Sequence, residues 1–325
     1  MPALDFRRRV ENLEESIGES GEISENNKEL IFDFKRDLAL NDMSDAWLQN
    51  LLSRLKIMAE TADFDFEGAS EEDLKGLVEE IQKRDVSDRT VLDYKKVLKR
   101  FYGWLNGGDH PEKVEWMNTT DRSKNGTLPE DVLTEEDVQE LIDSTTSART
   151  QAFIALLWET GARIGELMDL TVGDLRDYEH GLQIVIDGKT GQRRVPLISS
   201  IPQVRRWLNE HPDSDDSDAP LWAKFQQSGK GERVSYRYLR KSLENAGENA
   251  GIDKPMNPHH FRHSRATYLA SKFTEAQMCE WFGWVQGSDV PAKYVHMSGR
   301  DIDSSYAKLH GIEEDDEPDR SESVV

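Results

Sequence analysis

Apolar residues recur every three or four positions along much of the chain, which is the spacing that places them on one face of an α-helix. In the first hundred or so residues, the helical runs follow serines, which are favoured N-cap residues: Ser24, Ser44, Ser70 and Ser87. Ser70 has Asp73 three residues later, a pattern typical of a capping box. The sequence therefore predicts an N-terminal helical domain over residues 1–110.

The last helix of this domain, at about residues 87–105, is unusually basic. Its apolar positions mark a buried side, and much of the remainder carries Arg89, Lys95, Lys96, Lys99 and Arg100. A run of charge is most often a solvated face, but cationic side chains are also what DNA phosphates attract. Both interpretations stay open, and these five residues are the candidate DNA-binding residues.

A polar, turn-rich stretch follows and predicts a linker over residues 111–128. Beyond it, helices are expected to begin after Thr134 and after Ser147, and Gly161 suits the left-handed turn past the end of the second helix. Further helical runs lie at about residues 201–208 and 236–250.

One clear strand pattern interrupts these helices. One face of residues 182–187 is apolar, because Leu182, Ile184 and Ile186 alternate with Gln183, Val185 and Asp187. Residues 194–198 follow across a glycine-flanked turn segment, and the two segments together predict a β-hairpin. We expect a second domain over residues 129–312 and a fold that is mainly α with a small β-hairpin or sheet (α+β). The acidic run over residues 313–325 predicts a disordered tail.

The charge balance complicates any role with nucleic acid. The chain has 41 Lys and Arg against 63 Asp and Glu, a formal net charge of −22. Proteins that bind DNA usually carry positive charge, because neutralising phosphates releases condensed counterions. The acidic residues are dispersed along most of the chain, which favours adaptation to high salt: at about 1 M salt the Debye length is roughly 3 Å, so distant carboxylates barely repel a phosphate.

Other bulk features narrow the class of protein. The single cysteine, Cys279, excludes an internal disulfide framework and a cysteine-based zinc site. No stretch approaches the roughly 20 consecutive apolar residues of a membrane span. The first residues alternate charges and have no apolar signal-peptide core. We expect a cytoplasmic protein that does not associate with a membrane.

Three polar segments in the second half can carry chemistry. Residues 160–167 place Arg163 near a helix start. Taken without the other segments, Arg163 is explained most simply by an ion pair with Glu166. Glu166 itself is interpreted as structural rather than catalytic, since an acid near a phosphate would oppose binding. Residues 188–194 place Lys189 on a glycine-flanked loop, where it can reach a ligand or simply keep the turn soluble.

The third segment, residues 257–263, predicts a helix start at a proline. His259, Arg262 and His263 then lie at i, i+3 and i+4 on one face. The two histidines have the spacing of helical metal ligands, but no glutamate of the zinc-protease kind accompanies them and Arg262 would repel a cation. Structural roles suit His260 and His263 better, and we expect no metal.

In order and spacing, these segments resemble the tyrosine recombinase family (phage integrase and Xer-type). Its catalytic domain carries T-G-x-R-x-x-E-L, then G-K-x-x-K-x-R-x-V-P-L, then H-x-x-R-H, then L-G-[H/W] and finally Y-x-H. The matching stretches here are residues 160–167, 188–197 with Gln192 where a lysine is frequent, 259–263, 282–284 and 294–296. The resemblance covers roughly residues 127–312. The preceding helices are similar to the family's core-binding domain only in pattern, and the acidic composition is similar to members from salt-loving archaea.

The resemblance implies that the protein cuts and rejoins DNA through a 3′-phosphotyrosine, with Tyr294 as the nucleophile and with no cofactor. Without a metal, other positive charge must stabilise the phosphorane-like transition state. Arg163 and Arg262 suit this role, because each planar guanidinium can donate paired hydrogen bonds to non-bridging oxygens. The covalent link conserves the bond energy, so rejoining needs no ATP.

Proton transfers complete the implied mechanism. A tyrosine with an ordinary pKa of about 10 needs a base, and His259 is the candidate base or proton shuttle. Lys189, on its hairpin, is the candidate donor of a proton to the departing 5′-oxygen. Trp284 can donate its indole N–H to the phosphate while its ring packs against the tyrosine segment.

The implied partner is double-stranded DNA, bound by a homotetramer on synapsed sites and by a monomer in free solution. Two alternatives remain: DNA relaxation of the type IB topoisomerase kind, and a catalytically silent DNA-binding protein of the same fold. Tyr306 is a rival nucleophile, but it shares a helical stripe with Ile302 and Leu309, which indicates packing. That stripe suits either the chain's own core or docking into a neighbouring subunit.

Overall fold

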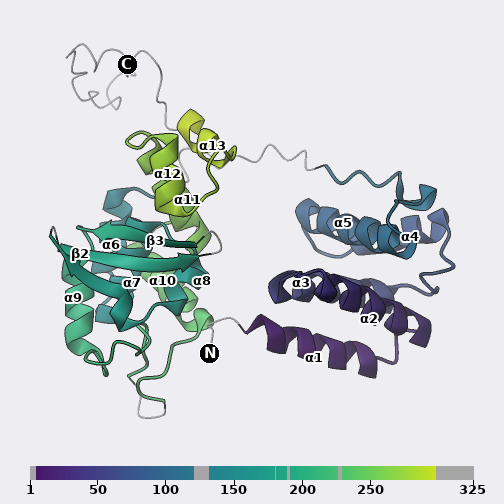
Figure 1. Cartoon of the computed structure of the whole chain (residues 1–325), viewed down its shortest axis with the longest axis horizontal. Helices are drawn as coiled ribbons and strands as arrows, with labels where there is room; N and C mark the ends of the chain where they lie inside the picture. Colours follow the sequence, from purple (N-terminus) through teal and green to yellow (C-terminus); the bar gives the residue numbers. More distant parts are fainter. Residues whose placement is uncertain (1–4, 121–131, 180, 189–190, 226–228, 298–325) are drawn as a thin grey trace. The chain divides into compact units, whose positions relative to one another are not determined.

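The computed structural model describes the chain except for residues 1–4, 121–131, 180, 189–190, 226–228 and 298–325 (Figure 1). The chain divides into two compact units, which meet in the sequence between Asn125 and Gly126. No described helix is both long and apolar enough to cross a membrane. Lys189, Tyr306 and the predicted acidic tail lie outside the described residues.

The N-terminal unit is helical, as the apolar spacing predicts. Its elements are α1 (Phe6–Glu19), α2 (Glu25–Leu40), α3 (Asp45–Thr61), α4 (Glu71–Gln82), α5 (Asp88–Leu105) and the 3-10 turn η1 (Glu112–Val114). All four predicted N-cap serines precede their helices, and Ser70 forms the predicted capping box with Asp73. The core gathers aromatic rings from separate helices, such as Phe34 and Phe101, whose centroids lie 5.3 Å apart.

The first part of the segment predicted as a linker packs on the N-terminal helices. Residues 112–114 form η1, and Val114 and Met117 are buried in the N-terminal core. Lys113 donates a hydrogen bond to the carbonyl of Ala69 at 2.8 Å, which ties this stretch to the helices. The sequence misleads here because two buried apolar residues stand among many polar and turn-forming ones.

The second unit is mainly helical with a small antiparallel sheet, which confirms the predicted fold class. Its helices are α6 (Glu135–Asp143), α7 (Ala148–Thr160), α8 (Ile164–Asp169), α9 (Ile201–Glu210), α10 (Tyr236–Ala250), α11 (Pro258–Ala270), α12 (Glu275–Phe282) and α13 (Val290–Met297), with the 3-10 turn η3 (Val172–Asp174). Buried residues cover α7 along almost its whole length, so it forms the centre of this core.

The sheet has the order β1-β2-β3, with strands β1 (Leu175–Tyr178), β2 (Gly181–Gly188) and β3 (Gly191–Leu197). The predicted hairpin is β2–β3, and the pairing of its strands extends to Gly188 and Gly191, further than the sequence suggests. Strand β1 escapes sequence detection because its two central residues are charged and exposed. Strand β3 contacts both α7 and α12, which brings the hairpin to the candidate site.

Candidate active site

The end of α7 begins the site. Gly161 adopts a left-handed conformation with φ 55°, and a Cβ atom there would come within 2.5 Å of the Phe282 ring. A glycine is therefore required both by the turn and by the close approach of α12. The chain then reaches Arg163, the N-cap of α8, whose side chain is 45% exposed and bonds to Glu166 at 3.0 Å. The ion pair expected from the sequence is present.

Arg262 joins segments that are distant in the sequence. It lies on α11 and is buried, with Nη1 donating to the carbonyl of Gly161 at 2.9 Å and Nη2 donating to that of Phe282 at 2.8 Å. Burial, and then the positive charge of Arg163, lower the pKa of Arg262 to about 10, so the side chain remains charged at neutral pH. Arg262 thus holds a positive charge at the meeting point of α7, α11 and α12.

Tyr294, on α13, packs against Trp284, whose ring lies beside this cation. Its ring lies parallel to that of Trp284, with centroids 5.4 Å apart, and Trp284 in turn stacks on Phe282 at 4.7 Å. The guanidinium of Arg262 lies 5.5 Å from the Trp284 ring centroid. Burial raises the pKa of Tyr294, while the charge of Arg262 opposes that rise. The phenol is therefore protonated at neutral pH and needs a base to become a nucleophile.

A histidine lies at the tyrosine hydroxyl, and it is not His259. The Nδ1 atom of His263 is 3.3 Å from the Tyr294 hydroxyl, and burial lowers the pKa of His263, so its ring is neutral at neutral pH. His259 is exposed, one turn earlier on α11, and makes no hydrogen bond or ion pair with any described residue. The sequence pattern gives His263 only a structural role; the packing of α13 on α11 gives it a contact with Tyr294.

The family is decided by comparison with known proteins. The model of the phage integrase family matches residues 131–300, more than half of the chain. The chain belongs to the phage integrase family. It is a tyrosine-type site-specific recombinase that acts on DNA.

Curated relatives of the recombinase include Xer proteins. It is 24% identical over 220 residues to the tyrosine recombinase XerC of Corynebacterium glutamicum, covering 66% of this chain and 69% of the relative. It is 25% identical over 269 residues to the tyrosine recombinase XerD of Oceanobacillus iheyensis, and this match covers 81% of this chain and 89% of the relative. It is 30% identical over 169 residues to the tyrosine recombinase XerA of Pyrococcus furiosus, and this match covers 49% of this chain and 56% of the relative.

Solved structures share its fold. The XerH recombinase in a post-cleavage complex with its difH substrate has a TM-score of 0.64 at 17% identity, over 95% of this chain and 97% of that one. A lambda integrase tetramer bound to a Holliday junction has a TM-score of 0.65 at 14% identity, and the match covers 85% of this chain and 78% of the integrase chain.

The structure brings four of the six predicted catalytic residues together in the recombinase: Arg163, Arg262, Trp284 and Tyr294. His259 lies on the same helix as Arg262 without touching Tyr294, and Lys189 lies outside the described residues. Two further residues lie beside this group and are not among the six predicted catalytic residues: His263 and Arg193. The alternation of Arg193 with Val195 and Leu197 on β3 could have placed it on the inward face.

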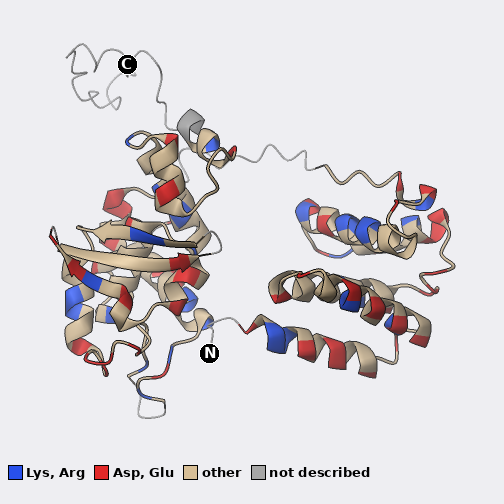
Figure 2. Cartoon of the chain, in the orientation of Figure 1, with Lys and Arg blue, Asp and Glu red and all other residues tan. Residues whose placement is uncertain are grey.

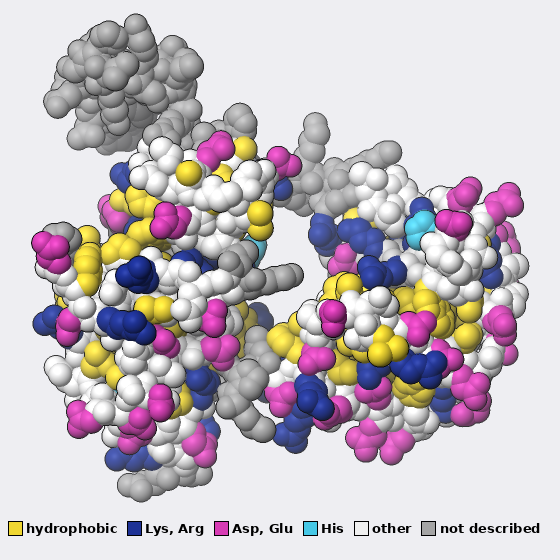
Figure 3. Space-filling model, in the orientation of Figure 1, with side chains coloured by type: hydrophobic (Ala, Val, Ile, Leu, Met, Phe, Trp, Pro, Cys, Tyr) yellow, Lys and Arg dark blue, Asp and Glu magenta, His cyan; other side chains and the backbone are white. Residues whose placement is uncertain are grey.

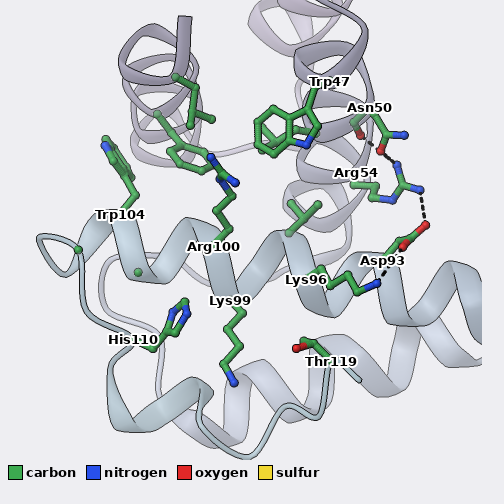
Figure 4. A pocket seen from close by; sticks show the side chains of 16 residues that line it. Trp47, Asn50, Arg54, Asp93, Lys96, Lys99, Arg100, Trp104, His110 and Thr119 are labelled. Atoms are coloured by element: carbon green, nitrogen blue, oxygen red, sulfur yellow. Dashed lines mark hydrogen bonds and ion pairs between the residues drawn. The ribbon is translucent and has the colours of Figure 1, made fainter. Parts of the chain in front are cut away.

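The candidate DNA-binding residues lie on α5, in the other unit, beside a groove of about 750 Å³ between α3 and α5 (Figure 4). Arg89, Lys96 and Arg100 are exposed and spaced as one helical stripe. Lys99 instead turns toward the following segment and donates to the carbonyl of Met117 at 3.3 Å, and Lys95 is partly buried. The five basic residues are therefore not equivalent.

Two features shape the charge of that groove. Asp93 pairs with Arg54 at 3.2 Å and with Lys96 at 3.9 Å, so the carboxylate is surrounded by cations. The Arg100 guanidinium lies 4.4 Å from the centroid of the Trp47 ring, which fixes it over an aromatic face. Basic side chains gather over α5, whereas acidic ones are scattered over both units (Figures 2 and 3).

Proposed function

We propose that Tyr294 is the nucleophile, which attacks a DNA phosphorus to form a 3′-phosphotyrosine and releases a 5′-hydroxyl. The observation that supports this most directly is the position of its hydroxyl, 3.3 Å from His263 and beside the cation of Arg262. The new O–P bond replaces the broken one, so the reverse attack by a 5′-hydroxyl rejoins the strand without an external energy source.

Arg163 and Arg262 are the proposed phosphate ligands. Arg262 is anchored by two carbonyls that leave its other guanidinium hydrogens available, and Arg163 is nearly half exposed, with one nitrogen held by Glu166. Such fixed donors stabilise charge that develops on the non-bridging oxygens at little reorganisation cost. Trp284 adds an indole N–H and holds the Tyr294 ring by stacking.

Two proton transfers remain to be assigned. A neutral His263 is placed to accept the Tyr294 proton, and His259, exposed one turn away, is the proposed shuttle between the phosphate and water. Lys189 follows Gly188 at the end of β2, and we assign it the donation of a proton to the departing 5′-oxygen.

The N-terminal unit is proposed to bind duplex DNA as a core-binding domain, with Arg89, Lys96 and Arg100 on the phosphate backbone. The lambda integrase is a tetramer on a Holliday junction, and we propose the same assembly for this recombinase on two synapsed sites. We further propose that it works in a salt-rich cytoplasm, an assignment supported by the net charge of −22.

A covalent trapping experiment tests this proposal. Nicked suicide DNA substrates, including the protein's own target, are incubated with the recombinase in high KCl, and the protein–DNA adduct is measured on a denaturing gel. The wild type and Tyr306→Phe should form the adduct, and Tyr294→Phe should not. An adduct that persists in Tyr294→Phe would overturn the nucleophile, and no adduct from the wild type would overturn the chemistry. Recombination between two sites, rather than relaxation of one plasmid, separates a recombinase from a topoisomerase-like enzyme.

A further inference from the structure

Arg193 is a charged residue on the inward face of a strand. Its side chain is 6% exposed, and it alternates on β3 with the buried Val195 and Leu197. Burying a guanidinium is costly unless it is paired and hydrogen-bonded. Its position therefore calls for specific partners, and these lie at the candidate active site.

Those partners connect three elements. The Nη2 atom of Arg193 lies 2.7 Å from a Glu166 carboxylate oxygen, and its Nε donates to the carbonyl of Trp281 at 2.9 Å. Trp281 precedes Phe282, whose carbonyl accepts from Arg262. Arg193 and Arg262 thus bind adjacent carbonyls at the C-terminal end of α12, where the helix dipole favours cations. That end leads directly to Trp284.

Glu166 transmits the effect to Arg163. Its carboxylate is 7% exposed, and it accepts from both the side chain and the backbone N–H of Arg163, at 3.0 and 2.9 Å. Burial would raise the pKa of Glu166, but bonds from Arg193 and then Arg163 outweigh it and hold that pKa below its ordinary value. Arg193 occupies one oxygen of the Glu166 carboxylate. The guanidinium of Arg163 therefore cannot bind both oxygens of Glu166, a bidentate pairing that would withdraw it from a phosphate. Arg193 also neutralises an acid that would otherwise repel that phosphate.

The end of β2, at Gly188, lies against the Glu166–Arg193 ion pair. A Cβ atom at Gly188 would meet a Glu166 oxygen at 2.8 Å and Nη1 of Arg193 at 3.1 Å. The buried Nη1 of Arg193 has no hydrogen-bond partner among the described residues. The strand end that precedes Lys189 therefore rests on the Glu166–Arg193 pair.

We propose that Arg193 is a positioning residue for strand cleavage: it orients Arg163 through Glu166 and ties the hairpin that carries Lys189 to the end of α12. This role rests on the proposed function, because it requires Arg163 to bind the phosphate.

The test compares Arg193→Met with Arg194→Met, an exposed neighbour on the same strand. In single-turnover trapping on suicide DNA, Arg193→Met should slow adduct formation by about 100-fold, the typical cost of a misplaced catalytic group. Its equilibrium affinity for DNA should fall far less than its cleavage rate, because the partly unpaired Glu166 charge affects one phosphate among many contacts. Arg194→Met should react like the wild type. Arg193→Lys should be intermediate, because an ammonium lacks the planar fork that reaches both partners.

A double-mutant cycle with Arg163→Lys separates positioning from general stabilisation. If Arg193 acts through Arg163, the loss caused by Arg193→Met should shrink to about tenfold or less in the Arg163→Lys background. An undiminished loss there would overturn the proposal, as would an Arg193→Met protein that cleaves as fast as Arg194→Met.

If Arg193→Met fails to fold, Glu166→Gln/Arg193→Met removes the unpaired buried carboxylate and should fold. It should still cleave slowly, because Arg163 then lacks its charged anchor, and a wild-type rate would contradict the positioning role. Wild-type protein that forms no adduct would instead contradict the proposed function itself.

Discussion

At the scale of single residues, opposing effects set the chemistry of Tyr294. Burial raises the free energy of the phenolate form, and the positive charge of Arg262 lowers it again in part. The parallel Trp284 ring restricts the phenol to one plane, with its hydroxyl toward His263. The tyrosine is thus held protonated and oriented, and the proposed attack by Tyr294 requires a base that is neutral at the working pH.

His263 therefore predicts a specific dependence of cleavage on pH. Because burial lowers its pKa below the ordinary 6.5, the neutral form is present at neutral pH and is lost only as the pH falls through that lowered value. Adduct formation by the wild type should decline on this acidic side. His263→Gln should slow cleavage by about 100-fold or more and remove that decline.

His259→Gln is the matched variant, one turn earlier on the same helix. It should slow cleavage but keep the acidic decline, as followed by single-turnover trapping between about pH 5 and pH 8. If His259→Gln abolishes the decline and His263→Gln leaves it unchanged, then His259 is the base and the contact in this structure is not the reactive one.

At the scale of elements, the site depends on how helix ends meet. The turn at Gly161 ends α7, supplies a carbonyl to Arg262 and lets Phe282 approach. Helix α12 ends at Gly283, also left-handed, and supplies the carbonyls of Trp281 and Phe282. Unpaired carbonyls at helix ends normally need partners, and here arginines provide them.

Gly161→Ala should accordingly destabilise the second unit. The left-handed backbone strain alone costs about 1–2 kcal/mol, and the contact with the Phe282 ring adds to it. Gly165→Ala is the control, since a Cβ there meets nothing within 4 Å and the residue lies in α8. Urea denaturation should show a lower free energy of unfolding for Gly161→Ala only. Equal values for the two variants would contradict the required close approach.

The basic stripe on α5 makes a prediction about DNA affinity. Replacing Arg89, Lys96 and Arg100 with alanine should weaken binding on all sequences, because the proposed contacts of these side chains are with phosphates rather than bases. The slope of log K against log salt should become less negative by about 0.9 for each phosphate that the variant no longer neutralises.

A charge-matched control comes from helices α2 and α4 of the same unit: Arg36, Lys75 and Lys83, which lie outside the α5 stripe, are replaced together. This control should keep the wild-type slope in fluorescence anisotropy titrations. Equal loss of affinity in both triple variants would mean that net charge, and not the stripe, controls binding.

At the scale of the whole molecule, charge is the dominant feature. Acidic side chains are scattered over both units, while the basic side chains on α5 are locally concentrated (Figure 3). Dispersed like charges destabilise a compact state through self-repulsion, and salt screens that repulsion. Short, buried pairs such as Arg193–Glu166, at 2.7 Å, are screened much less.

Stability should therefore rise with salt. The Debye length falls from about 10 Å at 0.1 M to about 3 Å at 1 M, so the midpoint of thermal unfolding should increase steadily over this range of KCl. Differential scanning calorimetry measures the midpoint, and sucrose at equal osmolality controls for general solute effects. A midpoint that is flat or falls with KCl would contradict the salt-adapted interpretation.

The sequence by itself determined the helix starts, the hairpin and the order of the chemical residues. Capping and periodicity depend on neighbours within a few positions, so Ser70 with Asp73, and Thr134 with Asp137, could be recognised directly. The same locality explains the failures: β1 and η1 owe their conformation to contacts with other segments rather than to their own residues.

Only the tertiary structure decided which side chains meet. Arg262 is anchored by carbonyls 101 and 20 residues away, and Arg193 reaches Glu166 and Trp281 across 27 and 88 residues. His259 and His263 are alike in the sequence, and the packing of α13 against α11 brings His263 to Tyr294. Such choices depend on how distant segments pack, because a side chain's burial and partners are properties of the folded chain.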